Sequence, residues 1–179
     1  MRSLAAYLGV SPMALYNHVE DKEDLLQGIA RHLLDGTQFS SASPDWRERI
    51  GACFRVLRNL CLAHPDAVRL METIAVAPLA VFSPMEITLA ALENVVKSGE
   101  DALCAYFLLI NFTLGQVSYE TRGPIKSLEV REALEKETLK DAGFPHIERA
   151  ASQQSWDFTR AFEFGLSIIL AGLDAQSKT

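Results

Sequence analysis

Apolar residues recur at helical spacing along most of this chain, and this periodicity constrains its fold more than any other feature. The segment with Leu25, Leu26, Ile29, Leu33 and Leu34 shows the pattern clearly. No stretch alternates between apolar and polar residues at the period of two that marks a half-buried strand. We therefore expect an all-α protein.

Glycine, proline and capping residues divide the first 36 residues into three helices. Gly9 can adopt the left-handed backbone that closes a first helix. Ser11 and Pro12 suit the N-cap and the first helical position of a second helix. Asp21 is a candidate cap for a longer helix that stops at Gly36.

A polar stretch that Pro44 closes, residues 37–45, is the expected domain boundary. It separates a small domain, residues 1–36, from a larger one, residues 37–179. In the larger domain the apolar spacing and the breakers predict helices over residues 45–64, 66–74, 84–98, 101–121 and 156–175. The third of these would be capped by Ser83 and followed by Gly99. Residues 125–154 are charged and are expected to be partly helical.

Charge and cysteine content limit the class of protein. The net charge of −6 disfavours a protein that coats nucleic acid through bulk charge, although a local DNA-reading surface stays possible. Arg2 is the single charged residue before Glu20, so phosphate contacts there would be few. The three cysteines form no CxxC pair, which argues against a zinc site or a disulfide framework. Since no signal peptide is evident, we expect a cytoplasmic protein. We also expect no cofactor and no metal.

One uncharged run, Ala102 to Tyr119, approaches the length of a membrane-spanning helix. Four polar residues interrupt it: Asn111, Thr113, Gln116 and Ser118. A helix buried in a protein bundle is the interpretation that we prefer, with no membrane partner.

The spacing of Leu4, Ala5, Leu8, Gly9 and Val10 is that of a helix-turn-helix motif. Ala5 is small where two helices must approach, and Gly9 permits the sharp turn between them. The second helix would then present its outer face to the major groove of DNA. Tight helix pairs in enzymes use similar residues, so the pattern alone leaves both possibilities open.

The segment LAAYLGVSPMALYNHVEDKEDLL resembles the second to fourth helices of tetracycline-repressor-family regulators. The similarity lies in the LGVS turn, the LYxHV recognition helix and the xDKxxLL start of the connecting helix. The segments NFTLGQVSYE, GFPHIERAA and FEFGLSIILAGLDAQ resemble the C-terminal domain of the same family. The resemblance implies a helix-turn-helix head on a helical-bundle domain that binds ligand and dimerises.

By motif position, the resemblance implies base or groove contacts by Pro12, Met13, Ala14 and Asn17, and backbone contacts by Tyr16, His18 and Lys22. Ser11, on the outer face of the second helix, and Arg2 are further DNA-binding candidates. Asn can pair with adenine, Ala and Met can touch a thymine methyl, and Tyr, His and Lys can reach phosphates. Two of these residues have a structural alternative: Tyr16 could brace the head, and His18 could be an ordinary turn residue. The family's head has three helices, and here we expect its first helix to be absent ahead of Met1.

The most apolar helices, residues 101–121 and 156–175, predict a homodimer built as a four-helix bundle. The candidate interface residues are Phe112, Gln116, Phe162, Leu166, Ile169, Leu170 and Leu173. Gly165 and Gly172, seven residues apart, would let a partner helix approach closely. The alternative is that both helices form the centre of a monomeric bundle.

The resemblance also implies a pocket for a small hydrophobic effector. Its candidate lining is apolar and aromatic: Phe54, Leu57, Cys61, Met71, Leu92, Leu103, Tyr106, Ile110 and Asn111. Each of these residues could equally be ordinary core. Where tetracycline-binding members carry drug-binding and metal-binding side chains, the corresponding residues here are Gln38, Cys53, Met71, Val95 and Tyr119. Because these residues provide few oxygen ligands for a hard cation, we do not expect tetracycline as effector.

No catalytic motif occurs in the chain, and its four histidines are dispersed, so we do not expect an enzyme. The function predicted is a homodimeric DNA-binding repressor that a small hydrophobic effector releases from its operator. The alternative is a dimeric ligand-binding scaffold that lacks DNA binding because its head is incomplete.

Overall fold

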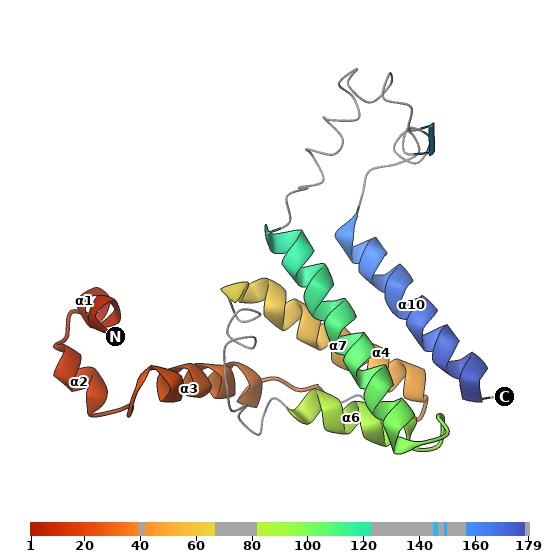
Figure 1. The fold of residues 1–179 in the computed structure, drawn as a ribbon, viewed down its shortest axis with the longest axis horizontal. Helices are drawn as coiled ribbons and strands as arrows, with labels where there is room; N and C mark the ends of the chain where they lie inside the picture. The colour runs from red at the N-terminus through yellow and green to blue at the C-terminus, as the bar shows by residue number, and fades with distance from the viewer. Residues whose placement is uncertain (40–41, 67–81, 123–144, 147–148, 150–156, 178–179) are drawn as a thin grey trace. The chain divides into compact units, whose positions relative to one another are not determined.

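The computed structural model describes residues 1–39, 42–66, 82–122, 145–146, 149 and 157–177, and every regular element in these ranges is helical (Figure 1). The main helices are α1 (Arg2–Leu8), α2 (Pro12–Tyr16), α3 (Lys22–Asp35), α4 (Trp46–Ala63), α6 (Ser83–Leu92), α7 (Gly99–Arg122) and α10 (Phe158–Ser177). The all-α prediction is confirmed. The chain forms two compact units, residues 1–91 and 92–179, and each is described by itself.

The helix ends of the first unit follow the predicted caps. The Ser11 hydroxyl accepts a hydrogen bond from the Ala14 amide at 3.1 Å, and Pro12 is the first residue of α2. The Asp21 carboxylate accepts one from the Asp24 amide at 2.9 Å at the start of α3. These side chains satisfy amides that have no partner within the helix, so α2 and α3 begin where they do.

Helix α4 carries much of the described core of the first unit. Asp45 caps it, and its carboxylate accepts a hydrogen bond from the Arg47 amide at 2.9 Å. One apolar stripe of α4 is buried and comprises Ile50, Cys53, Phe54, Leu57 and Cys61. The helix predicted over residues 66–74 lies outside the described residues, apart from Asp66.

Helices α6 and α7 correct the predicted boundary between them. The sequence pattern predicts one helix over residues 84–98 with Gly99 after its end, whereas α6 ends at Leu92 and Gly99 is the first residue of α7. The Leu92 carbonyl accepts hydrogen bonds from the amides of Val95, at 2.8 Å, and Val96, at 3.2 Å. The Ser98 hydroxyl accepts one from the Asp101 amide at 3.1 Å and donates one to the Asp101 carboxylate at 2.7 Å. This reciprocal cap favours a new helix over continuation of the old one.

In the second unit, α7 and α10 pack side by side (Figure 1). The rings of Phe112 and Phe162 stack between them, with centroids 5.5 Å apart and an interplanar angle of 17°. Within the described ranges α7 is the one helix long and apolar enough to cross a membrane, over Gly99–Thr121. One stripe of it is buried, comprising Ala102, Ala105, Tyr106, Leu109, Thr113 and Val117. This stripe is typical of a helix in a protein core.

Candidate nucleic-acid interface

The turn between α1 and α2 is closed by backbone hydrogen bonds of the Schellman type. Gly9 has φ 69° and ψ 25°, in the left-handed region that a glycine adopts without steric cost. Its amide donates to the Ala6 carbonyl at 3.3 Å, and the Val10 amide donates to the Ala5 carbonyl at 3.0 Å. The predicted sharp turn at Gly9 is therefore confirmed.

Ala5 is buried on α1, and α1 packs against α2. A small residue at a buried position of α1 is compatible with the close approach predicted for the two helices. The other residues expected in this crevice are less enclosed: Leu4, Leu15 and Val19 are half-buried, and Leu8 and Val10 are exposed. The described head therefore keeps a partly uncovered apolar side.

The outer side of α2 is solvent-exposed and carries most of the predicted DNA-contacting residues. Pro12, Met13, Tyr16 and Asn17 are exposed, Met13 with 73% of its surface accessible. Ala14 is half-buried, so it turns partly toward the head's interior. The spacing of the exposed residues puts them on one side of a helix, which is the geometry needed to face a groove.

The predicted contacts outside α2 are accessible as well. Arg2 and Lys22 are exposed at the first positions of α1 and α3. His18 is exposed just after α2, and its amide donates to the Leu15 carbonyl at 2.9 Å. The Ser11 hydroxyl oxygen accepts the cap bond from Ala14, which leaves its O–H free to donate to a phosphate.

The candidate effector residues differ in their exposure. Five are buried: Phe54, Leu57, Cys61, Leu92 and Tyr106. Leu103 and Asn111 are exposed on α7, Ile110 is half-buried, and Met71 lies outside the described residues. Of the residues at tetracycline-contacting positions, Gln38 and Tyr119 are exposed, Val95 is half-buried and Cys53 is buried.

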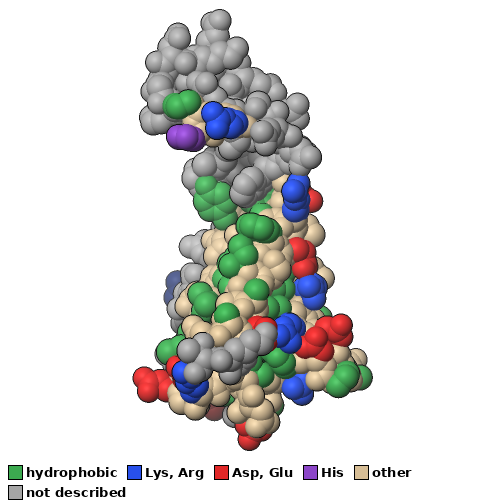
Figure 2. All heavy atoms as spheres, turned by 90° about the vertical axis from the view of Figure 1, so that its right-hand side faces the viewer, with side chains coloured by type: hydrophobic (Ala, Val, Ile, Leu, Met, Phe, Trp, Pro, Cys, Tyr) green, Lys and Arg blue, Asp and Glu red, His purple; other side chains and the backbone are tan. Residues whose placement is uncertain are grey.

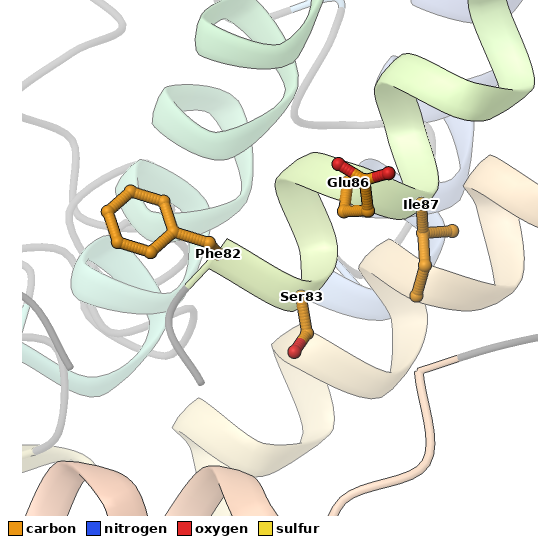
Figure 3. A pocket seen from close by; sticks show the side chains of 4 residues that line it. All are labelled: Phe82, Ser83, Glu86 and Ile87. Carbon is orange, nitrogen blue, oxygen red and sulfur yellow. The ribbon is translucent and has the colours of Figure 1, made fainter. Parts of the chain in front are cut away.

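An open depression lies elsewhere, at the start of α6 (Figure 3). It is lined by Phe82, Ser83, Glu86 and Ile87, none of which was predicted to bind a ligand. Ser83 and Ile87 point to the same side of the helix in the figure, while Phe82 points away from them. Among the described residues, no three histidine, cysteine or acidic side chains are grouped closely enough to hold a metal ion.

The candidate dimer residues are mostly used inside the chain itself. Phe162, Leu166, Leu170 and Leu173 are buried within one protomer, so their side chains have little surface to offer a partner. Phe112, Gln116 and Ile169 are half-buried. The apolar residues that α10 does expose are Phe164, 68% accessible, and Ile168, 55% accessible. Neither residue is among the predicted interface residues, although their spacing of four marks a second apolar stripe on the helix.

Comparison with known proteins identifies the architecture. The model of the tetracycline-repressor-like C-terminal domain matches residues 41–177. The chain belongs to the tetracycline-repressor family of transcriptional regulators. The family prediction is thus confirmed, and with it the prediction that the chain is not an enzyme.

Three relatives within or near this family are informative. An HTH-type transcriptional regulator of Saccharopolyspora erythraea is 29% identical over 98% of this chain and 75% of its own. ActR, a TetR family protein of Streptomyces coelicolor, was solved in complex with actinorhodin. It is 28% identical to this chain, with a TM-score of 0.78, and the match covers 100% of this chain and 88% of the ActR chain. BioQ, solved with its natural double-stranded DNA operator, is 25% identical with a TM-score of 0.65, over 97% of this chain and 84% of that one.

Proposed function

We propose that this tetracycline-repressor-family regulator is a homodimeric, cytoplasmic repressor that binds an operator through α2 and is released by a small hydrophobic effector. The observation that carries the proposal is the outer side of α2, where Pro12, Met13, Tyr16 and Asn17 are all exposed. Helix α2 is short, is held against α1 by a glycine turn and has a solvent-exposed outer side. These are the features of a recognition helix. The relative BioQ, solved with its operator, supports the same use of the head.

The dimer that we propose uses the side of α10 that the chain leaves uncovered. Phe164 and Ile168 project from this side, and exposed apolar residues of α7 add Leu103, Phe107 and Leu108 in the same unit. Figure 2 looks onto the side of α10 and shows hydrophobic side chains along its length, with charged side chains toward the edges. A two-fold operator requires two reading heads, so a dimer through this surface would supply them.

The effector that we propose is apolar and occupies the body near α4. Phe54, Leu57 and Cys61 are apolar or aromatic and carry no charge, as the lining of a site for an apolar ligand would. All three are buried in this structure, so the ligand would reach them only if the packing around α4 opens. ActR, which was solved with actinorhodin, supports a ligand-binding role for such a body. Trp46 at the start of α4 offers a fluorescence probe for binding, because it is half-buried on that helix.

The test is a mobility-shift assay of the chain with the DNA beside its own gene, at two salt concentrations. Sequence-selective binding that weakens with salt is expected, and Met13→Ala together with Asn17→Ala should abolish the selectivity. Ser3→Ala, at an exposed position of α1, is the matched control and should bind as the original chain does.

The second candidate function is a dimeric ligand-binding protein without DNA reading. The sparse positive charge of the head favours it, since Arg2, Lys22 and Arg31 are outnumbered by five acidic residues in residues 1–36. A dimer that shows saturable quenching of Trp46 fluorescence by an apolar ligand, but no selective DNA binding at low salt, would establish this function instead.

A further inference from the structure

We infer that the stretch of operator read by α2 consists of A·T pairs, recognised through thymine methyl groups by Met13 and through an adenine edge by Asn17. This inference rests on the proposed function, because it specifies what the head reads if it reads DNA. It is carried by the chemistry of the exposed side of α2 and by the electrostatics around it.

The exposed side of α2 contains no ionisable group other than the phenol of Tyr16. From Ser11 to Asn17 the chain has no Arg, Lys, Asp or Glu. Met13 is the most exposed of the large apolar residues of α2, at 73%. Because Met13 points outward from α2, its flexible thioether side chain is available to contact a base edge.

The base edges in the major groove differ in what they require from a protein. Guanine is most often read by Arg or Lys and cytosine by Asp or Glu, and α2 offers none of these. Thymine presents a methyl group that an apolar side chain can contact, as Met13 would. Adenine presents an acceptor and a donor that the amide of Asn17 can pair with together. Met13 and Asn17 therefore match A·T pairs, and α2 carries none of the ionised side chains that most often read G·C pairs.

The remaining polar groups beside α2 do not change this selection. The Ser11 oxygen caps the helix, at 3.1 Å from the Ala14 nitrogen. Its O–H can still donate, but a hydroxyl can pair with either kind of base pair and so does not select one. Arg2 lies on α1, so a guanine that it reads would fall outside the stretch under α2. His18 lies beyond α2, after the C-cap residue Asn17, in a turn where its amide donates to the Leu15 carbonyl. It is therefore at the end of the helix opposite to Met13.

The charges around α2 also weaken the attraction of the head to the phosphate backbone of DNA, which does not depend on base sequence. Residues 1–36 carry three basic and five acidic residues, so their formal net charge is −2. The start of α3 is occupied by its own carboxylates: Asp24 accepts from the Glu20 amide at 3.0 Å, and Asp21 accepts from the Asp24 amide at 2.9 Å. These amides are not available to a phosphate. With little attraction to the backbone of DNA, base contacts must supply a larger share of operator affinity.

The experiment starts with selection of bound sequences from random double-stranded DNA by the full chain and by its Met13→Ala variant. The positions at which the two selections differ mark the bases beneath Met13. We expect thymine there in the original selection, with A·T pairs at the adjoining positions. Because Met13 is exposed, the variant should keep the circular dichroism and unfolding midpoint of the original chain.

Base analogues then test the chemistry on the selected operator. Replacing the marked thymines by uracil removes only the methyl groups and should weaken binding about fourfold per methyl contacted. The Met13→Ala variant, whose side chain is shorter, should discriminate less between the thymine and uracil operators than the original chain does. Replacing adenine by 7-deazaadenine should weaken binding by the original chain and leave Asn17→Ala unaffected. Uracil at positions outside the half-sites is the matched control and should have no effect.

The outcomes separate this inference from the function on which it rests. Selected sites with G·C pairs beneath α2, or equal binding of thymine and uracil operators by the original chain, would overturn the A·T assignment while leaving DNA reading in place. Enrichment of no sequence at all would overturn the DNA-reading function itself, and this inference with it.

Discussion

The ring of Phe112 on α7 occupies the space that a β-carbon on Gly165 of α10 would need. The same ring stacks on Phe162, one turn earlier in α10, with centroids 5.5 Å apart. The close approach that the sequence assigned to a partner helix is therefore made within the chain at Gly165. At Gly172, by contrast, a β-carbon would meet no atom within 4 Å.

This relationship predicts opposite effects for the same substitution at two positions of α10. Gly165→Ala should lower the free energy of unfolding by about 1–3 kcal/mol, because the added methyl group displaces the ring of Phe112. Gly172→Ala should leave it unchanged or raise it by up to about 1 kcal/mol, because alanine favours the helix and has room. Urea unfolding of both variants measures the difference. Equal responses at the two positions would refute the proposed packing, and Phe112→Leu should relieve the penalty of Gly165→Ala.

The exposed apolar side of α10 predicts how the oligomer can be broken. Phe164→Glu together with Ile168→Glu should convert the dimer to a monomer, because each protomer would bury two charges in the interface without partners. Light scattering after size-exclusion chromatography measures the mass. Phe82→Glu, at an exposed phenylalanine outside the second unit, is the matched control and should stay dimeric. A dimer that survives the double substitution would move the interface away from this side of α10.

The cysteines should differ in reactivity by their burial. Cys104 is exposed on α7, whereas Cys53 and Cys61 are buried on α4. Burial raises the pKa of Cys53 to about 12 and that of Cys61 to about 11, so neither forms much thiolate near neutral pH. A chromogenic disulfide reagent at pH 8 should titrate one thiol rapidly in the native chain and the other two only on unfolding. Cys104→Ser should remove the rapid phase; a second rapid thiol would contradict the burial of α4.

The same pKa shifts predict a loss of stability in alkaline solution. In the unfolded chain both thiols ionise near their ordinary pKa of 9.0, while in the folded chain they stay protonated to about pH 11. The unfolded state then binds fewer protons, so the free energy of unfolding falls as pH rises above about 9. Urea unfolding at pH 8 and pH 10 should show this decrease. Replacing Cys53 by Ala should make the free energy of unfolding fall less between pH 8 and pH 10, whatever the substitution does to stability at pH 8.

The cap of α2 predicts a local effect on the head. Ser11→Ala removes the acceptor for the Ala14 amide and should cost about 1 kcal/mol of local stability. Hydrogen exchange at Ala14 should quicken, while the amides in the middle of α4 exchange at the original rate. Ser11→Asp, which keeps an acceptor, is the control. Unchanged exchange in Ser11→Ala would show that α2 does not depend on this cap.

The low positive charge of the head predicts a shallow salt dependence of operator binding. If Arg2 and Lys22 of each protomer make the phosphate contacts, a dimer neutralises about four phosphates, and the logarithm of affinity should fall with a slope of about −4 against the logarithm of salt concentration. Binding measured at several salt concentrations gives the slope. Lys22→Ala should make it less steep by about two, and a much steeper slope would mean that other cations reach the DNA.

Short-range patterns determined the class of fold and the head of this protein. Gly9, Ser11 and Asp21 act through hydrogen bonds to residues no more than four positions away, so the sequence pattern contained all that was needed to place α1, α2 and α3. The same kind of reasoning was wrong between α6 and α7, because the cap formed by Ser98 and Asp101 outweighed the expected role of Gly99 as a helix terminator.

Tertiary structure alone decided which side of α10 is covered. Both sides of this helix are apolar, so periodicity could not distinguish the buried stripe with Phe162 and Leu166 from the exposed one with Phe164 and Ile168. Which of them packs depends on the side chains that α7 brings against α10, and Phe112 selects the side with Gly165, where a ring fits because no β-carbon is present. The sequence alone could show that α10 is apolar, but the choice between its two sides required the position of a residue more than fifty positions away.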